Sequence, residues 1–143
     1  MPRIEGTKVG VDGLGRTVYS PIVFVHLLYG NLGLEVQAVV DSGADTTIVP
    51  AEIAAAVGVE WAQLPPGTKG LGVGGTCEMR LVDMTIKYKD WKYSGAVTIA
   101  EPKHLPVVLL GRTDFFRYFV ARFHWFKDPP EFHLDPAANG SKR

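Results

Sequence analysis

The chain has few of the residues that define several common protein classes. It contains a single cysteine, Cys77, in 143 residues, which excludes an intrachain disulfide framework and a cysteine-rich metal site. Lysine plus arginine and aspartate plus glutamate each total 15, so the formal net charge is zero. Without an excess of positive charge, the sequence does not indicate a nucleic-acid partner.

Long apolar segments are also missing. No run approaches the roughly 18 apolar residues that a membrane-spanning helix needs, and residues 1–6 lack the apolar core of a signal peptide. We therefore expect no membrane partner and a cytoplasmic location. His104, His124 and His133 share no spacing typical of a metal site, so the sequence predicts neither a metal nor another cofactor.

Strand signals dominate what is present. Short β-branched and aromatic runs, separated by glycine, proline and asparagine, indicate an all-β sandwich or barrel. Two short helices are expected, one over 50–57 behind an initial proline and one over 114–119. The predicted organisation is a flexible N-terminal arm over residues 1–17, one domain over 18–135 and a frayed C-terminal tail over 136–143.

One turn stands out because it carries two carboxylates. A β-branched run delivers Asp41 into a turn made by Ser42 and Gly43, and Asp45 follows four positions after the first acid. Hydrolysing an amide with carboxylates alone requires two of them around one water, one accepting a proton while the other donates one. Two such carboxyls in contact cannot both be ionised. Asp41 is therefore a candidate for half of this machinery.

The other half is absent from the chain. Asp12 is followed by glycine without a hydroxyl residue, Asp83 lies inside an alternating strand, and Asp114 begins a helix-like stretch. None of these is an equivalent partner for Asp41. If the chemistry is real, the second aspartate comes from a second copy of the chain related by two-fold symmetry.

Two further segments follow the acidic turn along the chain. A glycine-rich tip occupies residues 70–75, and an apolar strand ends in Gly111 and Arg112. The tip lacks the Gly-Lys-Ser/Thr ending of a phosphate-binding loop, which disfavours phosphate as a ligand. An arginine directly after a glycine turn more often binds a carboxylate than faces solvent.

These three segments, in this order, resemble the signatures of retropepsin-like aspartic proteases, and the resemblance spans roughly residues 21–134. The single-domain cellular or bacterial type fits better than the viral type, because viral members lack the helix over 50–57. The resemblance implies a closed β-barrel with a glycine-rich flap hairpin, one short inserted helix and one short C-terminal helix. It further implies a homodimeric aspartic endopeptidase that acts on a peptide or protein substrate without a cofactor.

The resemblance also assigns roles to individual residues. Asp41 would be the catalytic residue, one per chain, and an ion pair from Arg112 would hold Asp45. The remaining residues fall into three groups: support of the active-site loop by Ser42, Gly43, Gly111 and Arg112; substrate binding by Ala44, Asp45 and Thr46; and a flap formed by Leu71, Gly72, Val73, Gly74 and Gly75.

Two other interpretations stay open. A retropepsin-like domain used for dimerisation or peptide binding, with weak or no turnover, would share every motif. A small-ligand β-barrel in which Asp-Ser-Gly is only turn chemistry would be a monomer with an apolar cavity.

Overall fold

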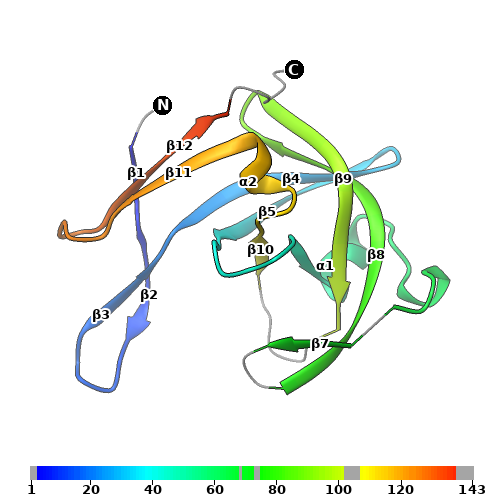
Figure 1. Ribbon diagram of the computed structural model, residues 1–143, viewed down its shortest axis with the longest axis horizontal. Helices are drawn as coiled ribbons and strands as arrows, with labels where there is room; N and C mark the ends of the chain where they lie inside the picture. The colour runs from blue at the N-terminus through cyan, green and yellow to red at the C-terminus, as the bar shows by residue number, and fades with distance from the viewer. Residues whose placement is uncertain (1–2, 68, 73–74, 102–106, 138–143) are drawn as a thin grey trace.

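The computed structural model describes residues 3–67, 69–72, 75–101 and 107–137, which are coloured in Figure 1. The strands are β1 (Arg3–Glu5), β2 (Thr7–Val11), β3 (Thr17–Ser20), β4 (Ile22–Tyr29), β5 (Leu32–Val40), β6 (Ile48–Pro50), β7 (Lys69–Gly72), β8 (Gly75–Tyr88), β9 (Trp91–Ala100), β10 (Val108–Leu110), β11 (Phe119–His124) and β12 (Glu131–Pro136). The helices are α1 (Ala51–Ala56), α2 (Phe115–Tyr118) and a 3₁₀ turn at Trp61–Gln63.

Strands β4, β5, β10, β6, β9 and β8 form a closed barrel. They are neighbours in that order within one sheet, and an additional antiparallel pairing of β4 with β8 joins the two ends. Alternate residues of β4 point inward, so Val23, Val25 and Leu27 are buried while Phe24 and His26 are exposed. The expected all-β barrel is confirmed by this closed strand pairing.

The parallel pair of β5 and β10 positions the candidate site. Val108 pairs with Ala38 and Leu110 with Val40, so both strands end at the same level of the sheet. The residues that follow them, Asp41 and Gly111, therefore leave the barrel side by side. Parallel neighbours need a long crossover connection, and here the intervening barrel strands supply it.

The N-terminal segment differs from the loose arm that the sequence predicts. β1 pairs with β12, matching Arg3 with His133 and Glu5 with Glu131, and β2 forms a hairpin with β3. The resulting sheet of β1, β12 and β11 lies to one side of the barrel with the β2–β3 hairpin below it (Figure 1). Only Ile4 is apolar within β1. The local pattern of apolar residues therefore could not predict that this segment forms a strand paired with β12.

The two predicted helices are present and shorter than their expected ranges. α1 follows Pro50 and ends before Gly58, whose φ of +92° favours glycine. In the glycine-rich segment, Gly72 pairs with Gly75 across a β7–β8 hairpin, where the sequence predicts the flap. The predicted flap residues Val73 and Gly74 lie outside the described residues, as does most of the predicted tail over 136–143. Nowhere in the described ranges does a helix reach the length and apolarity that crossing a membrane requires.

Candidate functional site

Asp41 is fixed by its own main chain and by the neighbouring strand. Its N–H donates to the carbonyl oxygen of Leu110 at 3.1 Å, and its carbonyl oxygen accepts the N–H of Ala44 at 3.2 Å. Its carboxylate Oδ1 accepts the N–H of Gly43 at 2.9 Å, a local bond typical of aspartate in turns. In the described part of the chain, Oδ2 accepts no hydrogen bond. One carboxylate oxygen is thus anchored while the other is available to a reactant.

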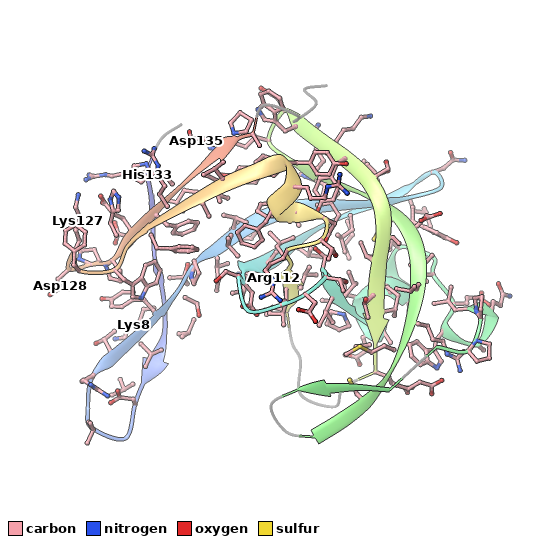
Figure 2. All side chains as sticks on the ribbon, viewed as in Figure 1. Lys8, Arg112, Lys127, Asp128, His133 and Asp135 are labelled. Carbon is pink, nitrogen blue, oxygen red and sulfur yellow. The ribbon has the colours of Figure 1, made fainter. Side chains whose placement is uncertain are left out.

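Arg112 connects the loop after β10 to the loop after β5 that carries Asp41. Its guanidinium donates to the carbonyl oxygen of Ser42 at 2.8 Å and forms an ion pair with Asp45. Its own N–H donates to the carbonyl oxygen of Ala44 at 3.0 Å, and the next N–H, of Thr113, donates to the carbonyl oxygen of Asp45 at 2.8 Å. The structure therefore brings together these four predicted residues. Figure 2 shows Arg112 near the middle of the molecule, by the loop after β5.

The ion pair between Arg112 and Asp45 matters more for the shape of the turn than for the stability of the fold. The side chains of Arg112 and Asp45 are 53% and 80% exposed, and exposed ion pairs stabilise a fold by about 0–1 kcal/mol. Because the guanidinium also binds a main-chain carbonyl, its planar set of donors fixes the shape of the turn that carries Asp41.

Gly111 allows the two loops to touch. Its N–H donates to the hydroxyl of Thr47 at 3.1 Å, and its carbonyl oxygen accepts the N–H of Phe116 at 3.2 Å. A Cβ placed on Gly111 would lie 2.2 Å from the carbonyl carbon of Thr46 and 2.3 Å from its oxygen. No other residue fits there without moving the backbone.

The predicted substrate-binding residues differ in how accessible they are. Ala44 is 7% exposed, so only its main chain borders the site. The hydroxyl of Thr46 lies 2.9 Å from that of Thr98 and donates to the carbonyl oxygen of Thr47 at 2.9 Å, so it already has partners within the chain. Of the three, Asp45 has the most exposed side chain for a ligand.

Sequence reasoning missed a buried network beneath the turn. Asp114 accepts the N–H of Thr47 on Oδ1 at 2.9 Å and the hydroxyl of Tyr93 on Oδ2 at 2.7 Å. Burial, and next the charge of Asp114, raises the pKa of Tyr93 well above its ordinary value. The sequence signal that could have revealed this network is an acid directly before the aromatic residues of α2. In the structure this acid does not cap the first turn of the helix.

Comparison with known families identifies the class of this arrangement. A family model described as aspartyl protease matches residues 29–113, a range that includes Asp41, the β7–β8 hairpin and Arg112. Comparison with curated protein sequences gives no significant match.

Many solved structures are similar to this chain in fold. A retropepsin-like aspartic protease from Rickettsia conorii has a TM-score of 0.62 at 14% identity, covering 93% of this chain and 99% of that one. EIAV protease complexed with the inhibitor HBY-793 has a TM-score of 0.56 at 24% identity, covering 68% and 86%. The retroviral protease-like domain of Ddi1 from Leishmania major has a TM-score of 0.52 at 19% identity, covering 69% and 79%. The retropepsin-like fold expected from the sequence is thereby confirmed.

Proposed function

The chain belongs to the aspartyl protease family, and from that premise we propose that it is a homodimeric aspartic endopeptidase. Asp41 from each of two copies shares one water molecule at the dimer axis. The observation that carries the proposal is the anchoring of Asp41 at the end of β5, where Gly43 fixes one carboxylate oxygen and Arg112 fixes the turn. Rigid placement of the reacting groups is what makes such chemistry fast.

The reaction balances with one ionised and one protonated carboxyl. The ionised Asp41 accepts a proton from water as the water oxygen bonds to the peptide carbonyl carbon. The protonated Asp41 of the partner subunit donates its proton to the carbonyl oxygen. Collapse of this intermediate breaks the carbon–nitrogen bond, the amine leaves with the proton that the first carboxyl took up, and the hydroxyl returns its proton to the second carboxyl.

A second copy is required because the neighbouring acids of the same chain have other partners. Asp45 pairs with Arg112, and Asp114 binds Thr47 and Tyr93. Ser42 and Gly43 are exposed in the single chain, which leaves the turn accessible to the same turn of a second copy. A symmetric contact at this turn would bring the two Asp41 carboxyls together.

In this proposal the substrate is an extended peptide lying across the dimer axis. Such a peptide adds strand-like hydrogen bonds, with its side chains in alternate pockets. The exposed carboxylate of Asp45 accepts a substrate N–H, together with the main chain of Ala44 to Thr46. The β7–β8 hairpin closes over the peptide and excludes water. Residues 18–135 form the peptidase domain.

The test is cleavage of a mixed peptide library over roughly pH 3–7. Asp41→Asn should abolish cleavage without changing the unfolding midpoint. Asp90→Asn, an exposed aspartate in the turn between β8 and β9, is the matched control and should keep full activity. Cleavage that survives in purified Asp41→Asn overturns the proposal. Peptide binding without cleavage by the unmodified dimer supports the alternative, a catalytically weak or silent dimerisation or peptide-binding domain.

A further inference from the structure

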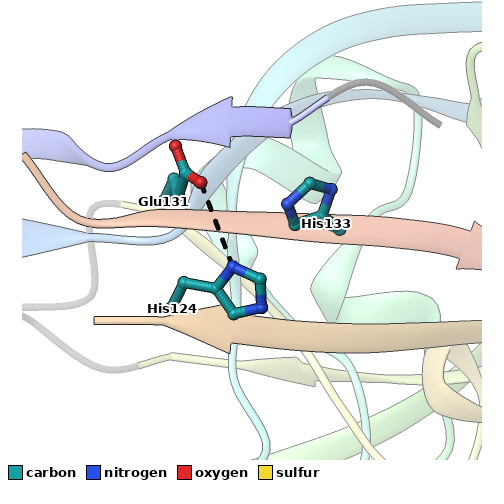
Figure 3. Close-up of side chains that lie close together, drawn as sticks. All are labelled: His124, Glu131 and His133. Atoms are coloured by element: carbon teal, nitrogen blue, oxygen red, sulfur yellow. Dashed lines mark ion pairs between the residues drawn. The ribbon is translucent and has the colours of Figure 1, made fainter. Parts of the chain in front are cut away.

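A second group of reactive side chains lies on the sheet of β1, β12 and β11, apart from the barrel strands that carry Asp41. In the β11–β12 ladder His124 pairs with Glu131, and Arg122 pairs with His133. Cross-strand partners share a face of the sheet, and so do residues two apart on one strand. His124, Glu131 and His133 therefore stand together, as Figure 3 shows.

The distances suit a metal ion. One ligand atom from each residue lies within 4.8 Å of the other two, and His124 Nδ1 is 3.9 Å from Glu131 Oε1. Ligand atoms about 2.0–2.1 Å from a tetrahedral zinc ion are about 3.3 Å from one another. Small rotations of these side chains would close that difference, and the strand pairing already fixes their backbones.

One of the three ligand atoms is buried without a hydrogen-bond partner. His124 Nδ1 is covered by the protein and makes no hydrogen bond to any described residue. A buried polar atom without a partner costs stability. Coordination of a cation by the Nδ1 lone pair would remove that cost. This atom lies on the side of the ring that faces Glu131 (Figure 3).

We propose that His124, Glu131 and His133 form a binding site for a divalent transition-metal ion such as Zn²⁺. Two imidazoles and one carboxylate are a ligand set that zinc accepts, with water in the remaining position. Nothing in the linear spacing of the three residues reveals it, because the antiparallel register creates the cluster. The bound ion crosslinks β11 to β12.

Lys127 is the built-in competitor for this site. Its ammonium lies 2.6 Å from Glu131 Oε1, while Arg3 lies 3.5 Å from Oε2. The hydrogen bond from Lys127 lowers the pKa of Glu131. The Lys127 side chain is 45% exposed and can turn into solvent when a metal replaces it. Glu5 and Asp128 line the adjoining hollow of about 290 Å³ and offset part of the positive charge.

The test is calorimetric titration of the full chain, without an affinity tag, with ZnCl₂. We expect one Zn²⁺ per chain, and a loss of affinity of about tenfold or more in each of His124→Gln, Glu131→Gln and His133→Gln. Lys127→Gln should bind more tightly, roughly two- to fivefold, because the competing ammonium is gone. If all three ligand variants bind Zn²⁺ as tightly as the unmodified chain does, or if the unmodified chain binds no Zn²⁺, the proposal is overturned.

The matched control is His26→Gln. His26 lies 3.6 Å from Glu35 on the barrel, so it offers a histidine and a carboxylate without a second histidine, and its loss should leave Zn²⁺ affinity unchanged. NMR of the unmodified chain tests the site even if a ligand variant misfolds. Zn²⁺ should shift the imidazole NMR signals of His124 and His133, and a shift confined to other histidines also overturns the site.

Discussion

Gly111 packs against the main chain of Thr46 so closely that a Cβ on Gly111 would lie 2.2 Å from the Thr46 carbonyl carbon. This contact joins the loop after β10 to the loop that carries Asp41. Gly111→Ala should therefore lower the free energy of unfolding by about 1–3 kcal/mol, the usual cost of overpacking. Urea denaturation measures the change.

Gly95→Ala is the control for that substitution. A Cβ on Gly95, in β9, would meet no atom within 4 Å, and alanine is favoured over glycine inside regular elements. Its unfolding midpoint should stay the same or rise. Equal effects of the two substitutions would mean that the contact between the loops is not tight.

Arg112→Lys should reduce kcat/KM by about 10- to 100-fold while changing the free energy of unfolding by less than about 1 kcal/mol. Lysine keeps the charge but cannot hold the Ser42 carbonyl and the Asp45 carboxylate with one planar group. Steady-state cleavage of a peptide substrate and urea denaturation separate the two effects. Arg122→Lys, at the Arg122–Asp135 ion pair of 3.0 Å on β11 and β12, should leave kcat/KM unchanged.

Stability should fall at alkaline pH because of Tyr93. Burial and the charge of Asp114 raise the pKa of Tyr93 in the folded protein well above the ordinary tyrosine value of 10.0, so the folded state keeps a proton that the unfolded chain releases. The resulting stability is full below pH 10 and is lost as pH rises from there through the folded pKa. Tyr93→Phe should cost about 1 kcal/mol at neutral pH and progressively less above about pH 10. Urea denaturation across this range tests it, and a cost independent of pH would contradict it.

Mixing chains tests whether two copies of Asp41 act together. When an equal amount of Asp41→Asn is added to the unmodified chain and allowed to exchange, random pairing leaves about half of the original active dimers. The cleavage rate should fall to about half, and an equal mass of an unrelated protein should have no effect. A rate that does not change after exchange would indicate catalysis by single chains.

Local signals predicted the parts of the fold that depend on neighbours in sequence. Gly30 has a φ of +57° between β4 and β5, as expected of a hairpin turn rich in glycine and asparagine. The same holds for α1 behind Pro50 and for the turn at Asp41, where Gly43 donates to the aspartate carboxylate. In each case the side chains that set the conformation lie within a few positions.

The features that local sequence patterns did not predict depend on pairing between distant parts of the chain. The contact of Asp114 with Thr47 and the pairing of β1 with β12 join residues far apart in the chain. The cluster of His124, Glu131 and His133 depends on the register of a hairpin, and a shift of one residue would put its side chains on opposite faces. These relationships are properties of the assembled sheets.

The parallel pairing of β5 with β10 also sets the order in which the site can form. Ser42 and Arg112 are separated by 70 positions. β10, whose Leu110 carbonyl accepts the N–H of Asp41, comes after all the other barrel strands in the chain. Contacts of such high sequence separation close slowly and late in folding. During synthesis, a chain that ends before β10 has neither the Leu110 carbonyl nor the Arg112 guanidinium to hold Asp41. The proposed hydrolytic activity would therefore be delayed until the barrel is complete, and the nascent chain and its neighbours would be protected from premature cleavage.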